Sequence, residues 1–459
     1  MGSRWAGCAA IVAGVLLGGV RLTAQASDIP RLQIERYTLP NGLEVILHED
    51  HTVPIVAVST YYHVGSSDEQ RGRTGFAHLF EHIMFMGSQH VPVGKFDQWL
   101  EAAGADNNGN TTEDRTNYFE WMPSNALPLA LWLDADRMGW LLPTMDLPKV
   151  DLQREVVKNE RRESYDNRPY GRADETILAA LYPPGHPYSW PVIGSMTDLS
   201  AATLDDVRGF FRTYYAPNNA TLVVAGDFRP DSAKRWIARY FADIPRGPAL
   251  PARPRVQPFT VPRDTFLVLE DHVQLPRVLY AWHSVKAFHP DDAALSMLAY
   301  ILAGDRASRL YRDLVYDRQV AQEVNASQEG HRLDGLFSID VTPKRDIAPA
   351  MIDTLVRAAV HRVIDSGVTE LELRRAKNVH HAQVLDRLAS VNEQAALLNY
   401  YDWFAGTPDY VVQDAARFDR LTVADIQRVA HRYLGGHVVE LTVVPQGHAE
   451  LEVRGAAGE

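Results

Sequence analysis

Cysteine is nearly absent from this chain. The single cysteine among its 459 residues is Cys8, which lies in the first segment of the sequence. If that segment is removed, the remaining chain has no thiol to act as a nucleophile and no cysteine pair to form a disulfide. Thiolate catalysis and a disulfide framework are therefore excluded for the mature protein.

An excess of basic residues is also missing. The net charge is −12 at pH 7 and the pI is about 5.8. A surface that neutralises many phosphate groups needs clustered Lys and Arg, so the composition argues against a broad nucleic-acid footprint. With 46% hydrophobic and 23% charged residues, the composition indicates a globular protein long enough for two or more domains.

The hydrophobic run near the start is too short to cross a membrane. It extends from Ala6 to Val20, follows Arg4 and precedes the small residues of Ala24-Gln25-Ala26. About 15 residues fall short of the roughly 20 that span a bilayer. This order predicts a secretory signal peptide that is cleaved near Ala26, and hence a periplasmic or secreted protein. A membrane anchor is the alternative interpretation.

Proline, by contrast, gathers in one place. The segment 244–258, "IPRGPALPARPRVQP", contains five prolines and one glycine and divides the mature chain nearly in half. Such a composition favours a semi-rigid extended linker over a helix or a strand.

The two halves on either side of this segment resemble each other. Thr203 and Thr422 begin similar helix patterns, which lead into "ATLVVAGD" and "VELTVVPQ" at a constant offset of 219 residues. Each half also opens with alternating apolar residues followed by Glu-Asp-His, at 49–51 and at 270–272. A repeat of about 220 residues explains these matches.

Strand patterns and long helical patterns are mixed in both halves. We therefore predict an α+β fold of two similar domains, each a mainly antiparallel sheet packed with helices, joined by the proline-rich linker. The predicted boundaries are 1–26 for the signal peptide, 27–245 for the first domain, 246–258 for the linker and 259–459 for the second domain.

The stretch "TGFAHLFEHIMFMG" is apolar but contains His78, Glu81 and His82. On a helix, His78 and His82 lie one turn apart on one face, as two ligands of one metal ion require. Hydrogen-bonded core histidines are the alternative. The complete His-x-x-Glu-His pattern on a buried helix favours the metal site, because burying two imidazoles and a carboxylate without partners would cost several kcal/mol.

A catalytic zinc ion usually takes three protein ligands, so one ligand must come from elsewhere. A second helix is predicted after Asp146, with Leu152 and Val156 on its apolar stripe and Glu160 at the next position. Glu155 is rotated away and is predicted to be solvated, as are Arg161 and Arg162. Glu160 is therefore the predicted third ligand, with a buried salt-bridge partner or a surface acid as the alternative.

These ligands predict a chemistry. Two neutral imidazoles and one carboxylate leave Zn²⁺ a net positive charge and an open position, so that a bound water loses a proton near neutral pH. Glu81 is the natural general base beside that water. The sequence thus predicts zinc-dependent hydrolysis of peptide bonds.

The sequence resembles the pitrilysin/insulinase family of zinc peptidases, M16, whose His-x-x-Glu-His inverts the motif of thermolysin-like enzymes. Its single-repeat bacterial members and the catalytic subunit of the mitochondrial processing peptidase are the most similar. The resemblance covers nearly the whole mature chain and rests on "LPNGLEVILHED", "GSSDE", "TGFAHLFEHIMFMGS", "NERR", "DNRPYG" and "YYAPNNATLVVAGD". It implies LuxS/metalloenzyme-like domains that form a clamshell, one Zn²⁺ per chain bound by His78, His82 and Glu160, and Glu81 as base.

The resemblance also implies a substrate-binding edge strand within "NNGNTTEDRTNYFEWMP", where Asn108, Thr111 and Tyr118 match residues that contact an extended peptide. A plain turn at Asn108-Gly109 is the alternative. Seven positions before the third ligand, many relatives carry an acid where this chain has Gln153, which can offer hydrogen bonds around the metal site but no charge.

The second half contains no matching metal ligands. Aligning Gly304 with Gly87 puts Leu295, Leu298 and Ala299 in the places of His78, Glu81 and His82. The family's substrate-holding Arg and Tyr cannot be placed: Arg277 and Tyr280 point to opposite faces of a strand, and Arg309 and Tyr311 suit a helix. The resemblance therefore implies a partner chain, in a homodimer or in a heterodimer with a motif-free sister subunit.

Three functional hypotheses follow from these residues. The first is an exported zinc endopeptidase that acts on peptides or unfolded segments. The second is a noncatalytic scaffold or partner subunit, which would have no reason to keep His78, His82, Glu160 and Glu81 together. The third is a metal carrier, which would not need Glu81.

Overall fold

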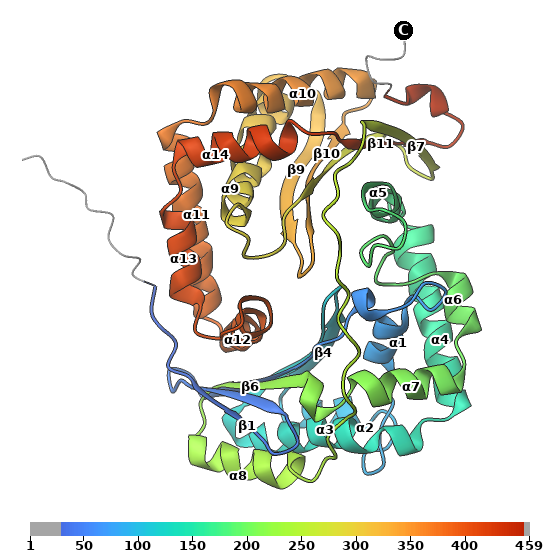
Figure 1. Cartoon of the computed structure of the whole chain (residues 1–459), viewed down its shortest axis with the longest axis vertical. Helices are drawn as coiled ribbons and strands as arrows, with labels where there is room; N and C mark the ends of the chain where they lie inside the picture. Colours follow the sequence, from blue (N-terminus) through green and yellow to red (C-terminus); the bar gives the residue numbers. More distant parts are fainter. Residues whose placement is uncertain (1–28, 454–459) are drawn as a thin grey trace, which may run out of the picture.

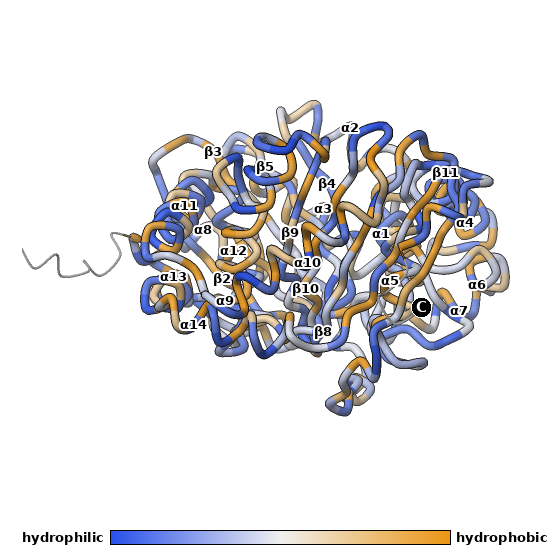
Figure 2. The backbone as a smooth tube through the Cα atoms, turned by 90° about the horizontal axis from the view of Figure 1, so that it is seen from above, coloured by the Kyte–Doolittle hydropathy of each residue, from blue (hydrophilic) through white to orange (hydrophobic). Residues whose placement is uncertain are grey.

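The computed structural model describes residues 29–453 and shows two stacked halves of similar construction (Figure 1). The signal peptide predicted for 1–26 lies outside these residues. In the described part of the chain, no helix combines the length and the apolar character needed to cross a membrane. Hydrophobic and hydrophilic stretches alternate along the coloured part of the tube in Figure 2, as they do in a protein with internal cores.

The first half is built on a six-stranded sheet, which we call the first sheet. Its order is β1-β2-β6-β3-β5-β4, and β2 and β6 form its one parallel pair. The strands are β1 Glu35–Thr38, β2 Glu44–Glu49, β3 Ile55–Tyr62, β4 Asp106–Thr111, β5 Thr116–Pro123 and β6 Ala220–Gly226. The helices are α1 Phe76–Ile83, α2 Lys95–Ala102, α3 Leu127–Trp140, α4 Leu147–Arg161, α5 Ala173–Leu181, α6 Met196–Ala201, α7 Leu204–Tyr214 and α8 Pro230–Phe241.

The second half repeats this plan on a five-stranded sheet, the second sheet. Its order is β7-β11-β8-β10-β9, with β7 and β11 as the parallel pair. The strands are β7 Thr265–Asp271, β8 Arg277–Ser284, β9 Ala321–Gly330, β10 Gly335–Pro343 and β11 Val439–Pro445. The helices are α9 Asp292–Ala303, α10 Pro349–Ser366, α11 Glu370–Leu388, α12 Val391–Ala405, α13 Val411–Asp419 and α14 Val423–Val429.

The two sheets have the same strand order once β1 is set aside, which confirms two similar, mainly antiparallel α+β units. The repeated helix starts are equally alike. Thr203 and Thr422 both accept a hydrogen bond from the backbone N–H three residues later, and Asp206 and Asp425 return the bond. No helix or strand lies between 242 and 264, the stretch that contains the predicted linker. The domain boundaries themselves stay a prediction.

Each half supplies one helix that packs on the sheet of the other half. One face of the first sheet packs on α1, α3, α7 and α8, but Val223 and Ala225 on its other face contact Val391, Ala395 and Leu398 of α12. In the second sheet, α5 from the first half covers the face opposite α9 and α10. Figure 1 shows α12 above β6 and α5 beneath β11. Neither sheet is therefore covered by its own half alone.

Candidate metal centre

The N-cap position of helix α1 requires a glycine. Gly75 has φ +86°, and a Cβ atom there would lie 2.7 Å from the carbonyl oxygen of Ile193. Because glycine offers no capping side chain, the buried carboxylate of Glu69 accepts hydrogen bonds from Gly75 N (3.0 Å) and Ala77 N (2.8 Å). The motif "GSSDE" thus contains the residue that fixes the start of the helix.

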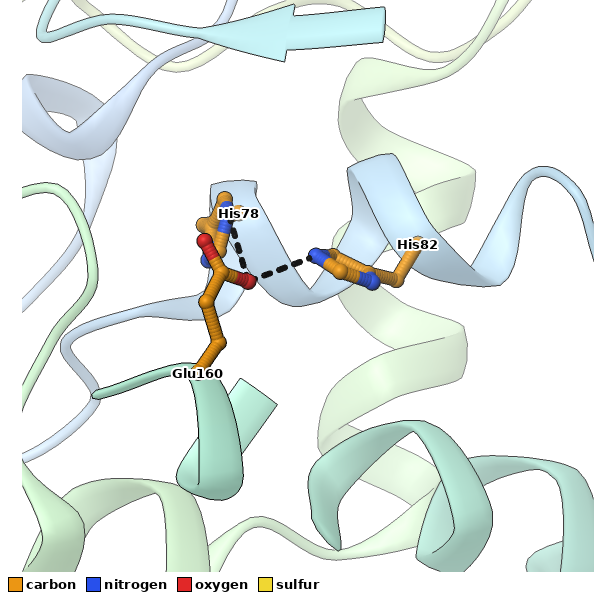
Figure 3. A group of neighbouring side chains, drawn as sticks. All are labelled: His78, His82 and Glu160. Carbon is orange, nitrogen blue, oxygen red and sulfur yellow. Dashed lines mark ion pairs between the residues drawn. The ribbon is translucent and has the colours of Figure 1, made fainter. Parts of the chain in front are cut away.

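Two histidines of α1 and one glutamate of α4 converge on a single point (Figure 3). Glu160 Oε2 lies 3.2 Å from His82 Nε2 and 3.7 Å from His78 Nε2. One ligand atom of each residue lies within 4.8 Å of the others, and this is the only such group of three or more His, Cys, Asp or Glu found within 29–453. The structure therefore brings together the three residues predicted as ligands.

The charge state of this group suits a metal. Burial lowers the pKa of His78 to about 4, so its imidazole is neutral at pH 7. The hydrogen bond with His82 lowers the pKa of the Glu160 carboxyl, which is therefore ionised. His78 Nδ1 is buried and has no hydrogen-bond partner among the described residues. Two imidazoles and one carboxylate form the donor set of a catalytic zinc site, so the residues fit the ion.

Helix α4 presents Glu160 by a different face from the one predicted. The side chain of Asp146 caps it by accepting a hydrogen bond from Lys149 N, as expected. The prediction that Leu152 and Val156 form its buried stripe is wrong, because their exposed fractions are 54% and 39%. Val150 and Val157 are buried instead, and Glu160 lies three positions after Val157, so it still faces inward.

The neighbour of Glu160 also differs from expectation. Arg161 was predicted to be solvated, but it is 8% exposed and pairs with Glu175 at 2.7 Å. Glu155 is exposed, as predicted. A charged side chain beside a metal ligand gives no sign of burial in a single sequence, because an arginine in the last helical turn is usually solvated.

Glu81 sits between the ligands and the edge strand β4. Thr111 Oγ1 donates a 2.6 Å hydrogen bond to Glu81 Oε2. A Cβ atom at Gly109 would lie 3.1 Å from Glu81 Cγ, so the strand passes close to this side chain. Burial raises the pKa of Glu81, while the Thr111 hydrogen bond opposes that rise. The carboxylate is thus held in a fixed position beside the imidazoles.

The other residues predicted to contact substrate are dispersed. Asn108 and Gly109 lie within β4, not at a turn, and Asn108 is exposed. Tyr118 is fully buried and its hydroxyl donates to the carbonyl oxygen of Phe80. Tyr118 therefore supports α1, and its burial contradicts the predicted contact with substrate.

Gln153 and the candidate residues of the second half contact groups other than the three metal ligands. The Gln153 amide donates to Met86 Sδ at 2.7 Å rather than to a ligand. Leu295, Leu298 and Ala299 are all buried in the core of the second half. Arg277 stacks on Tyr170, whereas the Tyr280 hydroxyl donates to Asp353. Arg277 and Tyr280 thus occupy opposite faces of β8, and neither forms part of the metal centre.

Known proteins match this chain along most of its length. Residues 44–186 match the family model described as insulinase (peptidase family M16), and residues 201–379 match the peptidase M16 inactive domain. "Zinc protease PqqE" of Helicobacter pylori is 29% identical over 87% of this chain and 90% of its own length. A probable mitochondrial-processing peptidase subunit beta of Arabidopsis thaliana is 20% identical, over 86% of this chain and 75% of that relative.

The fold comparison agrees with the sequence comparison. The crystal structure of a protease from Helicobacter pylori superposes with a TM-score of 0.84 at 26% identity, covering 91% of this chain and all of that one. The insulinase match contains His78, His82 and Glu160, whereas the inactive-domain match begins at residue 201 in the first half and continues to 379 in the half that lacks the cluster. This chain belongs to the insulinase family of peptidases, M16, as a single-unit bacterial type similar to the beta subunit of the mitochondrial processing peptidase.

Proposed function

We propose that this protein is a zinc-dependent endopeptidase that hydrolyses peptide bonds in peptides or unfolded segments. The observation that supports it most directly is the convergence of His78, His82 and Glu160 on one point, with Glu81 on the same helix. The name of the relative from Helicobacter pylori points to the same chemistry.

The roles of the residues follow from their positions. Zinc held by His78, His82 and Glu160 would supply a Lewis acid that acidifies a water molecule and polarises a carbonyl group. We assign Glu81 as the general base, which accepts a proton from the attacking water and then gives it to the leaving amine. Thr111 holds the Glu81 carboxylate, and burial makes it a stronger base than an exposed one.

Strand β4 is the proposed binding place of the substrate chain. It lies at the edge of the first sheet and is hydrogen-bonded only to β5 among the described strands. An extended peptide can pair with such a free edge. Asn108 is exposed along it and Thr111 lies beside Glu81. A peptide on this edge would therefore pass next to the proposed base.

The alternative is a noncatalytic scaffold or partner subunit. Four clustered polar residues, with the imidazole of His78 buried and that of His82 half-buried, favour an enzyme over a scaffold. We further propose that the protein is exported and works as a homodimer or with a motif-free sister subunit, since one relative is itself named as a subunit.

The decisive experiment measures zinc content and peptide hydrolysis of the purified mature protein and of Glu81→Gln. We expect one zinc per chain in both, with hydrolysis in the variant reduced about 10²-fold to 10⁴-fold. Full activity of the variant would refute the mechanism. The assay is repeated with any motif-free homologue encoded nearby, because a missing partner would also silence the wild type.

A further inference from the structure

A loop between α5 and α6 contacts the start of the helix that carries both histidines. We call residues 191–198, from Pro191 to Asp198, the bridging loop, although its last three residues already form the first turn of α6. Asp198 Oδ2 accepts hydrogen bonds from Thr74 N (3.0 Å) and Thr74 Oγ1 (2.7 Å), and Ser195 N donates to Thr74 Oγ1 at 3.0 Å. Three bonds thus tie the loop to the residue just before the N-cap of α1.

The same loop presses its glycine against the N-cap itself. Gly194 has φ +73°, and a Cβ atom there would lie 2.4 Å from both Cα and N of Gly75. Two backbones that approach this closely leave no room for any side chain. Any shift of Gly194 would therefore shift the start of α1 as well.

The other end of the contact belongs to α4. Arg161 Nη1 donates to Gly194 O at 2.7 Å, and Arg161 Nη2 donates to Glu175 Oε2 of α5 at 2.7 Å. Arg161 directly follows Glu160 in the chain. One guanidinium group thus joins the last turn of α4 to the loop that touches the first turn of α1.

We propose that Arg161 is a positioning residue of the metal centre. Through its hydrogen bond to Gly194 O, it sets the distance between Glu160 on α4 and the histidine pair on α1. The inference rests on the proposed function, because it treats these three residues as zinc ligands.

The physical reason is the narrow tolerance of a metal site. Ligand distances must hold within about 0.2 Å. Helices α1 and α4 pack against each other, but the chain connects them only through the 63 residues from Met84 to Asp146. The planar fork of arginine directs two N–H groups at two fixed acceptors, which a lysine ammonium on a flexible stem cannot do in the same geometry. Replacing Arg161 should therefore widen the range of α4 positions and weaken zinc binding.

The test measures the zinc dissociation constant of the full-length mature protein by competition with a chelator. We expect Arg161→Met to bind zinc about 10-fold to 100-fold more weakly than the wild type, as seen when groups that orient metal ligands are removed. Arg161→Lys should fall between the two. The melting temperature of each metal-free variant is recorded beside its zinc affinity.

The second half offers a matched control. Arg309 contacts a glutamate and a glycine carbonyl in the same way, with 2.7 Å to Glu372 Oε1 and 3.1 Å to Gly367 O. Arg309→Met removes comparable bonds far from the ligands and should leave zinc affinity unchanged. Affinity that falls in Arg161→Met and not in Arg309→Met supports positioning over general loss of stability.

Other outcomes would overturn the proposal. Unchanged zinc affinity in Arg161→Met, or an equal loss in Arg309→Met, contradicts a positioning role. If Arg161→Met does not fold, Arg161→Lys decides, and wild-type affinity in that variant overturns the proposal. A wild type that binds no zinc refutes the proposed function instead, so the two failures are distinguishable.

Discussion

Helix α1 in the first half and helix α9 in the second occupy equivalent positions in their halves. Their side chains differ in polarity at three aligned positions. Each contacts the edge strand of its sheet, β4 or β9, and a long neighbouring helix, α4 or α11. In α9, Leu295, Leu298 and Ala299 stand where α1 has His78, Glu81 and His82. The fold thus tolerates apolar side chains at these three positions, and the polar residues of α1 serve something other than folding.

This difference has an energetic side. A buried polar atom without a partner costs about 1 to 3 kcal/mol, and His78 Nδ1 is such an atom among the described residues. The same burial of leucine in α9 is favourable. The first half therefore gives up stability at its helix, and the second half keeps it.

The largest expected effect comes from removing a ligand. His82→Ala should abolish zinc binding and reduce hydrolysis to background, because two remaining ligands do not make a catalytic site. His272→Ala, at an exposed histidine after β7 in the second half, should change neither. Zinc content and peptide hydrolysis are measured on both. Zinc retained at full stoichiometry in His82→Ala would show that the centre lies elsewhere.

A core change in α12 tests whether the halves are separate. Leu398→Ala empties a position against the first sheet and should lower the free energy of unfolding by about 2 to 5 kcal/mol. Leu385→Ala, at an exposed position of α11, is the control and should cost far less. Chemical unfolding is followed by fluorescence and by zinc release. Zinc release in a separate, unshifted transition would mean that the first half is stable without α12.

A smaller effect is expected at the base. Thr111→Val removes the hydrogen bond to Glu81 and should lower kcat about tenfold to a hundredfold with little change in KM, since a hydrogen bond to a charged group contributes about 1.5 to 3 kcal/mol. Thr111→Ser keeps the hydroxyl and should retain most activity. A raised KM at constant kcat would instead assign Thr111 to substrate binding.

The smallest effect concerns pH and the contact between the halves. His63 stacks on Trp403 of α12 at 4.1 Å, and burial, aided by Arg253 and Arg332, lowers the pKa of His63 to about 3. The unfolded chain takes up a proton near pH 6.5 and the folded protein does not. Stability is therefore complete above pH 6.5 and falls as the pH drops towards 3.

Between pH 7.5 and 5.5, this group should cost about 1 kcal/mol of the free energy of unfolding. Urea unfolding of the wild type and of His63→Gln at both pH values measures it as the difference between the two proteins. Equal losses in both would show that His63 is protonated in the folded state as well.

Much of this architecture could be predicted from the sequence because it is local or repeated. The helix starts at Asp146, Thr203 and Thr422 follow from capping chemistry within three residues. The two-unit fold follows from the repeat. The ligand spacing on α1 follows from helix geometry alone.

The rest depends on contacts between distant segments. Helix α4 has two candidate apolar stripes, and only its packing decides that Val150 and Val157 are buried while Leu152 and Val156 are not. The sequences of α5 and α12 do not predict that each helix packs on the sheet of the other half. An apolar face shows that a helix is buried but not which sheet it covers.

Because α12 packs on the first sheet, the first half can be completed only late in the synthesis of the chain. Strand β6 ends at Gly226, but the helix that covers its second face ends at Ala405. At about 5 to 20 residues per second, synthesis leaves this face open for roughly 10 to 40 seconds. Residues such as Val223 and Ala225 stay exposed to water and to chaperones throughout that interval. A nascent chain therefore cannot finish its first half before most of the second has been made.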